Sequence, residues 1–177
     1  MPRILRPSLK NLEGRKELVG AEIGVFLGAN SETILQNLDI KKLYLIDPYH
    51  EGYCLFKIAG YKSFMAKEEA HKRLTPYSDK IVWVEDSTDS RMYYIDDVFD
   101  FVYVDGDHKY DGVMKDLNNF YPLLKDGGVI GGHDFDKEDA GNQVVRAVYD
   151  FFNALNKDVH FDADPYDNRT KDWWVFK

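Results

Sequence analysis

Two apolar stretches of the chain end abruptly in carboxylates and imidazoles. In FVYVDGDHKYDG, residues 101–112, four apolar residues lead directly into Asp105, with His108 three positions later. In GVIGGHD, residues 128–134, a second largely apolar run ends in an imidazole and a carboxylate. Such groups are costly to desolvate unless they are paired or lie at an edge. Each stretch is therefore either a polar turn or one wall of a functional site.

The chemistry open to these residues is metal binding or proton transfer. Asp105, His133 and Asp134 could converge on one divalent ion. Carboxylates suit magnesium or manganese, and imidazole tolerates manganese, iron or zinc. His108 could instead act as a general base, because an imidazole pKa of about 6.5 suits proton removal near neutral pH. A single histidine is more often a surface residue, but this grouping favours a site.

A glycine-containing turn lies near the beginning of the chain, in EIGVFLGANS, residues 22–31. Gly24 would let the backbone approach a ligand, and Gly28 would permit tight entry into a following helix, whose amino end favours anions. The spacing G-x-x-x-G differs from the G-x-G-x-x-G of dinucleotide-binding folds, so a pyrophosphate cradle is not indicated. The alternative is a tight turn that needs two glycines.

Asp47 ends a second apolar run, 23 positions after Gly24. An acidic residue at this spacing can accept hydrogen bonds from both hydroxyls of a ribose. Alone, Asp47 followed by proline is more simply the start of a turn. Paired with the glycine turn, it favours ribose binding.

The stretch VEDSTD, residues 84–89, offers two further polar groups. Asp86 could accept from an adenine amino group, and Ser87 could bond a ring nitrogen or, equally well, cap a helix. Trp173 and Trp174 are interpreted as core and edge packing rather than a stacking platform.

The pattern of apolar residues predicts which elements position these groups. Strands are expected at residues 18–26, 41–49, 80–86, 99–105, 128–134, 159–163 and 172–177. Helices are expected after residue 29, capped by Asn30 or Ser31, at 61–74, from 113 until the DGG of residues 126–128 closes it, and around 144–155. Apolar strands alternating with helices predict a parallel sheet that is covered on both faces, with right-handed crossovers. Ligands of such sheets bind beyond the carboxyl ends of the strands, which here are polar.

Composition limits the classes of partner. The chain has 177 residues and a formal net charge of −8, which suit one acidic globular domain and disfavour a nucleic-acid partner. Cys54 is the only cysteine, so an intramolecular disulfide is impossible. The amino-terminal sequence lacks the apolar core of a signal peptide, and no run approaches the length of a membrane span. A cytoplasmic protein is expected.

Three segments together resemble the class I S-adenosylmethionine-dependent methyltransferases, and especially the small branch of cephalosporin-hydroxylase-like and macrocin O-methyltransferase-like proteins. They are EIGVFLGANS, LYLIDPY and FVYVDGDHKYDGVMKDLNNFYPLLKDGGVIGGHDF. The resemblance runs from about Gly20 to Phe152. It implies a single Rossmann-like α/β domain over residues 1–177, with residues 1–19 as an extension or lid. It also implies a seven-stranded, mostly parallel sheet whose last strand is antiparallel, with helices on both faces.

The resemblance also implies roles for particular residues. It places the methionine part of the cofactor near Glu22, Gly24 and Gly28, the ribose near Asp47, and the adenine near Asp86 and Ser87. Asn30, Ser31 and Asp105 are further candidates for binding the cofactor. In metal-dependent relatives, residues at the positions of Asp105, His133 and Asp134 bind magnesium. His133 departs from the carboxylate of those relatives. His108 stands where some relatives carry a base, so the catalytic candidates are Asp105, His108 and Asp134.

We therefore expect a methyltransferase that uses S-adenosylmethionine to methylate the hydroxyl oxygen of a small molecule, with or without a divalent metal. An amine acceptor stays open. Two other hypotheses stay open. The first is a catalytically silent cofactor-binding module. The second is a nucleotide-dependent oxidoreductase on a related sheet, which the G-x-x-x-G spacing disfavours. A homodimer through the edge strands is compatible with the sequence.

Overall fold

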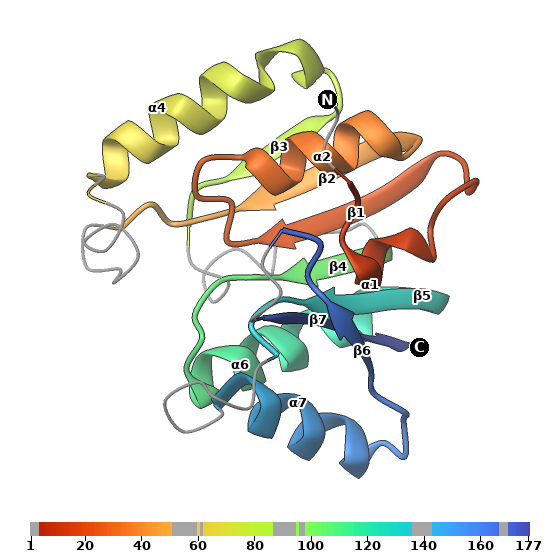
Figure 1. Ribbon diagram of the computed structural model, residues 1–177. Helices are drawn as coiled ribbons and strands as arrows, with labels where there is room; N and C mark the ends of the chain where they lie inside the picture. The colour runs from red at the N-terminus through yellow and green to blue at the C-terminus, as the bar shows by residue number, and fades with distance from the viewer. Residues whose placement is uncertain are drawn as a thin grey trace.

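The computed structural model describes residues 4–50, 60, 62–86, 95, 98–135, 143–166 and 170–177. One seven-stranded sheet runs through the centre of the molecule in the order β3-β2-β1-β4-β5-β7-β6 (Figure 1). The strands are β1 Leu18–Ile23, β2 Ile40–Ile46, β3 Ile81–Val84, β4 Phe99–Val104, β5 Leu124–Gly132, β6 His160–Ala163 and β7 Lys171–Phe176. Strands β1 to β5 pair in parallel, whereas β7 is antiparallel to both of its neighbours. The predicted fold class is confirmed.

Helices cover both faces of this sheet. They are α1 Pro7–Lys10, α2 Ala29–Asn37, α4 Ser63–Leu74, α6 Tyr110–Phe120 and α7 Gln143–Ala154, with 3₁₀ turns η1 Thr75–Tyr77 and η3 Tyr121–Leu123. Buried residues of α1, α2 and α4 share one hydrophobic cluster, and those of α6 and α7 share the other. Within the described residues, no helix has the length and apolar character needed to cross a membrane.

The side chains of β4 are buried on both faces of the sheet, so helices have to pack against each face. Phe101 and Tyr103 belong to the cluster beneath α1, α2 and α4, whereas Val102 and Val104 belong to the opposite cluster. All four side chains are buried, as expected for a central parallel strand. β6 lies at one edge of the sheet, and each of its residues is exposed.

Two predicted helix boundaries are wrong. The amino-terminal cap of α2 is Gly28, in the left-handed conformation at φ 72°, rather than Asn30 or Ser31. The latter two side chains are drawn away from the helix end by hydrogen bonds to Glu22. The DGG of residues 126–128 does not close a helix either, because α6 ends at Phe120 and DGG lies within β5.

The amino-terminal segment is part of the core. Leu5, Leu9 and Leu12 are almost completely buried in the cluster that also holds α2 and α4. The short helix α1 contacts β5, β6 and β7. This position brings the first described residues next to the carboxyl-terminal hairpin of β6 and β7.

Candidate active site

A cavity of about 290 Å³ opens beyond the carboxyl ends of β1 and β4. It is lined by Arg6, Glu22, Gly24, Val25, Phe26, Leu27, Ala29, Asn30, Thr33, Asp105, His108 and Tyr166. The glycine turn supplies one side of the cavity and the polar end of β4 supplies another. Residues predicted from separate stretches of the sequence therefore share one ligand-sized space.

Gly24 is required by the backbone of β4. Its φ is 86°, and a Cβ added there would lie 2.0 Å from the carbonyl oxygen of Asp105. This requirement is additional to the predicted approach of a ligand, because Gly24 also lines the cavity. Gly24 lets the loop after β1 pass directly against the end of β4, which brings the cofactor candidates next to Asp105.

Asp47 organises the loops that follow β1 and β2. Its Oδ2 accepts hydrogen bonds from the amides of Val25 at 3.0 Å and Phe26 at 2.9 Å. Its Oδ1 accepts one from the amide of Tyr49 at 2.8 Å. Phe26 and Tyr49 both have positive φ, at 50° and 45°, a conformation that bulky side chains rarely adopt. Burial raises the pKa of Asp47 above its ordinary value, and the three amides oppose that shift.

Glu22 is a buried carboxylate that lines the cavity. It accepts hydrogen bonds from the Nδ2 of Asn30 at 3.0 Å and from the hydroxyl of Ser31. Burial raises the pKa of Glu22 to about 7, against the effect of these two hydrogen bonds. Asn30 and Ser31, predicted to bind the cofactor, hold this carboxylate in place.

Asp105, His108 and Asp134 come together at the ends of β4 and β5. One ligand atom from each lies within 4.8 Å of the others. The Nε2 of His108 is 3.1 Å from Asp134 Oδ2 and 3.6 Å from Asp105 Oδ1. The interaction with Asp105 and the charge of Asp134 raise the pKa of His108 above its ordinary value, although burial opposes them. Asp134 itself has a positive φ of 56°, a conformation that aspartate tolerates better than most residues.

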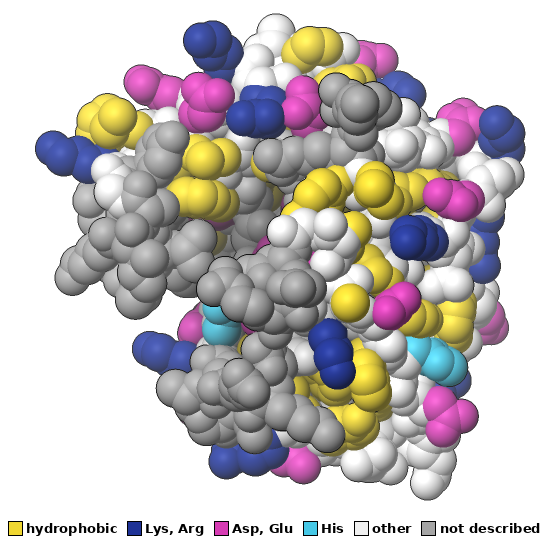
Figure 2. Space-filling model, viewed as in Figure 1, with side chains coloured by type: hydrophobic (Ala, Val, Ile, Leu, Met, Phe, Trp, Pro, Cys, Tyr) yellow, Lys and Arg dark blue, Asp and Glu magenta, His cyan; other side chains and the backbone are white. Residues whose placement is uncertain are grey.

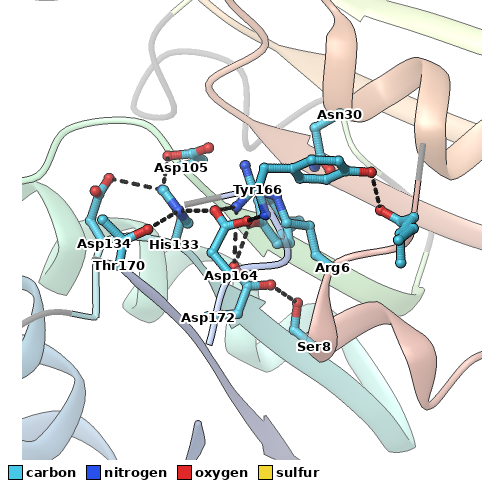
Figure 3. Close-up of polar contacts among 12 residues, drawn as sticks. Arg6, Ser8, Asn30, Asp105, His133, Asp134, Asp164, Tyr166, Thr170 and Asp172 are labelled. Atoms are coloured by element: carbon cyan, nitrogen blue, oxygen red, sulfur yellow. Dashed lines mark hydrogen bonds and ion pairs between the residues drawn. The ribbon is translucent and has the colours of Figure 1, made fainter. Parts of the chain in front are cut away.

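His133 lies beside this group and faces a second carboxylate. Its Nδ1 is 3.4 Å from Asp134, and its Nε2 is 2.7 Å from Asp164 and 2.9 Å from the hydroxyl of Thr170 (Figure 3). Burial lowers the pKa of His133, but the hydrogen bond to Asp134 and the charges of Asp105 and Asp134 outweigh it and raise the pKa to about 9. A protonated His133 forms ion pairs with Asp134 and Asp164. The group of possible metal ligands contains His108 where the sequence predicted His133.

A network that the sequence analysis did not identify continues from Asp164. Arg6 forms an ion pair with Asp164 through Nη1, and the same nitrogen lies 3.7 Å from Asp172 (Figure 3). Asp172 is fully buried and accepts hydrogen bonds from Ser8 at 2.9 Å and Tyr103 at 3.1 Å. The sequence shows only the acidic, proline-containing stretch FDADPYD, residues 161–167, which begins within β6 and gives no indication of a partner at position 6.

The remaining predicted residues have clear positions. Asp86 follows β3 at the same edge of the sheet as Asp47. Ser87 lies outside the described residues. Trp173 is buried in the core cluster, and Trp174 is partly buried against the opposite cluster, as expected from their interpretation as packing residues.

Comparison with known proteins identifies the class. Residues 21–135 match a family model described as a methyltransferase domain, and the chain belongs to that family. It is also 30% identical over 151 residues to the uncharacterized protein R132 of Acanthamoeba polyphaga mimivirus, covering 80% of this chain and 62% of that protein. The chain thus spans about 62% of the length of this curated relative.

Solved structures share the fold at low sequence identity. A putative methyltransferase from Streptococcus mutans in complex with SAH superimposes with a TM-score of 0.70 at 13% identity, covering 99% of each chain. The O-methyltransferase TomG from Streptomyces achromogenes, in complex with SAM, gives 0.68 at 16%, covering 96% of this chain and 78% of that one. A putative rRNA-methylase from Clostridium thermocellum gives 0.68 at 16%, covering 96% and 92%. The fold is that of the Rossmann-like methyltransferases.

Proposed function

We propose that this protein transfers a methyl group from S-adenosylmethionine to a hydroxyl oxygen of a small molecule. The observation that carries the proposal is the single cavity of about 290 Å³ that joins the glycine turn and Glu22 to Asp105 and His108. One side of this cavity offers carboxylate and amide groups to the amino-acid part of the cofactor. The other offers a base next to the position where an acceptor would enter.

The reaction is a displacement at the methyl carbon of the sulfonium. The acceptor oxygen forms a bond to this carbon, the carbon–sulfur bond breaks, and S-adenosylhomocysteine leaves. The hydroxyl proton passes to the Nδ1 of His108, while the Nε2–H of the same ring donates to Asp134 at 3.1 Å and orients the imidazole. The cofactor supplies the reactivity, so the protein has to align the two reactants and accept one proton.

A divalent metal would fit the same cluster. Asp105, His108 and Asp134 would hold it, and two carboxylates with an imidazole suit manganese, iron or zinc better than magnesium. Such an ion would lower the pKa of an acceptor hydroxyl and orient it. With the metal bound, His108 would be a ligand, and the acceptor proton would leave to solvent or to another carboxylate.

A small acceptor fits the charge of the protein better than RNA does. The formal net charge is −8. Among the side chains coloured in Figure 2, Lys and Arg are scattered between acidic residues rather than gathered in one broad area. RNA binding rests on neutralising phosphates, and this surface offers little for that. The rRNA-methylase neighbour therefore supports the fold and not an RNA substrate.

Binding of the cofactor is the first test. Calorimetry with S-adenosylhomocysteine should show binding to the wild-type protein, and no binding by a protein with intact circular dichroism would refute the proposal. NADH fluorescence titration is the matching control, because binding of NADH instead would favour the oxidoreductase reading.

Turnover is the second test. Formation of S-adenosylhomocysteine should be measured with panels of phenols, sugars, hydroxy acids and amines, with and without Mn²⁺ or EDTA. His108→Gln should reduce turnover by about a hundredfold or more and leave the Kd of the cofactor within about threefold. His160→Gln, on exposed β6, is the matched control and should change neither. Turnover of amines alone would overturn O-methylation, and binding without turnover of any acceptor would favour the silent module.

A further inference from the structure

Arg6 brings a cation to a cavity that is otherwise lined by acidic and neutral groups and one histidine. No other lysine or arginine lines the cavity among the residues that the structure describes. Glu22 and Asp105 supply the two carboxylates of the same lining. The cavity therefore presents positive and negative groups to one ligand, which is the pattern that an amino acid requires.

The buried carboxylates of the final hairpin hold Arg6 in position. Its Nη1 pairs with Asp164, whose side chain is 2% exposed, and approaches the fully buried Asp172. Ser8 and Tyr103 hold Asp172 in turn. A guanidinium carries five N–H donors in a planar fork. Within the described part of the chain, the polar contacts of Arg6 use Nη1, and Arg6 is one of the residues that line the cavity. Binding of a ligand in the cavity would therefore draw on the N–H donors of Nε and Nη2.

Two segments enclose the guanidinium of Arg6, and we call them together the clasp. They are the amino-terminal residues 4–8 and the residues 164–172 after β6 that contact them, namely Asp164, Tyr166 and Asp172. The hydroxyl of Tyr166 donates to the carbonyl oxygen of Ile4 at 2.7 Å. The guanidinium carbon of Arg6 lies 5.9 Å from the centre of the Tyr166 ring. Figure 3 shows Arg6 between the carboxylates of the hairpin and the ring of Tyr166, on the side toward Asn30.

We infer that Arg6 is a binding residue for the carboxylate of the methionine part of the cofactor, while Glu22 receives its ammonium group. The inference rests on the proposed use of S-adenosylmethionine and names the group that recognises its amino-acid end. A guanidinium is suited to this task because its fork pairs with a carboxylate through two parallel hydrogen bonds. The clasp would thereby tie the first residues of the chain to cofactor binding.

A ligand that lacks only this carboxylate tests the inference. S-adenosyl-3-thiopropylamine keeps the adenosine, the sulfur and the amine of S-adenosylhomocysteine. We expect the wild-type protein to bind S-adenosylhomocysteine roughly ten- to a hundredfold more tightly than this amine, as for the loss of one charge-assisted hydrogen-bonded pair. Arg6→Met should abolish the preference, measured by calorimetry with both ligands.

Two further variants separate recognition from folding. Ser8→Ala removes a hydrogen bond to Asp172 within the same clasp but does not line the cavity, so it should keep the preference. Arg6→Lys keeps the charge beside Asp164 and Asp172 but loses the fork, and should reduce the preference at least about threefold. This variant decides the matter if Arg6→Met does not fold.

The outcomes are distinct. An equal loss of affinity for both ligands in Arg6→Met, with the preference retained, would make Arg6 a structural residue and overturn the inference. A wild-type protein that does not distinguish the two ligands would overturn it as well. A wild-type protein that binds neither ligand would refute the proposed function itself.

Discussion

The two halves of the site are held together by different interactions. The cofactor half comprises Glu22 of β1 and the loops after β1 and β2, residues 24–28 and 47–49. Here one carboxylate, Asp47, accepts three backbone amides, and the residues around it adopt positive φ. The geometry of these two loops depends on the main chain and on the single carboxylate of Asp47.

The acceptor half comprises Asp105, His108, His133, Asp134 and Asp164. These residues come from the ends of β4 and β5 and from the turn after β6, and charged side chains connect them. The chain of contacts runs on from Asp164 to the amino-terminal segment through an arginine. No member of this half depends on one partner alone.

The two halves should therefore respond differently to single substitutions. In the cofactor half, a change at one backbone position or one acceptor removes several interactions at once. In the acceptor half, each residue has at least two charged partners, so removing one contact leaves a second. We therefore expect stability to be more sensitive to changes in the cofactor half.

The largest effect is expected from Gly24→Ala. The added Cβ would lie 2.0 Å from the carbonyl oxygen of Asp105, and both atoms are attached to the main chain, so a strand end has to move. We expect a loss of about 4 kcal/mol or more in the free energy of unfolding, measured by urea denaturation. Gly14→Ala is the control: its φ is 81° with nothing within 4 Å of the added Cβ, so a loss of about 1 kcal/mol is expected. Equal losses would show that φ alone requires these glycines.

Asp47→Ala should have the next largest effect. It leaves the amides of Val25, Phe26 and Tyr49 without their acceptor, two of them at positions with positive φ. We expect a loss of about 3 kcal/mol in stability and weaker binding of S-adenosylhomocysteine. Asp47→Asn, which keeps one acceptor oxygen, should lose less. Asp134→Ala should weaken cofactor binding less than Asp47→Ala, and equal effects on binding would contradict the division into two halves.

The position of the cofactor candidates at one edge of the sheet could be predicted from the sequence for a physical reason, whereas their binding of a cofactor stays a prediction. Glu22 lies near the end of β1, Gly24 and Gly28 follow β1, and Asp47 follows the adjacent β2. The parallel order alone brings these strand ends to one edge. The backbone conformation of these turns is also indicated by residue type, by glycine at positions 24 and 28 and by an aspartate before proline at position 47. The hydrogen bonds of Asn30 and Ser31 to Glu22 were not visible, because a helix cap and a buried partner use the same residue types.

The acceptor half was predictable only in part. The predicted order of the strands places Asp105, His108 and Asp134 at neighbouring strand ends, and the structure has these three side chains together. The direction of His133 depends on Asp164, which lies 31 positions later, and Arg6 pairs with that aspartate across 158 positions. Local pattern carries no information on such long-range side-chain pairs, because tertiary packing decides them.

Glu22→Gln should raise the free energy of unfolding at alkaline pH. The gain measures how much the buried carboxylate of Glu22 destabilises the folded protein. The pKa of Glu22 is about 7 in the folded protein, against 4.5 in the unfolded chain. The folded state therefore holds the proton more tightly, and this group lowers stability as pH rises from about 4.5 through 7, with no further change above. We expect the variant to be roughly 2–3 kcal/mol more stable than wild type at about pH 8 and equal near pH 4.

Denaturation of both proteins across this pH range provides the measurement, and subtraction removes the contributions of all other groups. Cofactor binding should weaken in the same variant, because the amide cannot neutralise an ammonium group. A constant difference at all pH values would mean that Glu22 has no raised pKa and that the variant acts through packing.

The smallest effect is expected from Thr170→Val in the acceptor half. The substitution keeps the shape of the side chain and removes the hydroxyl that lies 2.9 Å from the Nε2 of His133. The same nitrogen stays 2.7 Å from Asp164, so its hydrogen is not left without an acceptor. The loss in the free energy of unfolding should be about 0.5–1 kcal/mol. A loss that equals that of Asp47→Ala would mean that the contacts of the acceptor half do not substitute for one another, and that its charged pairs act as one unit.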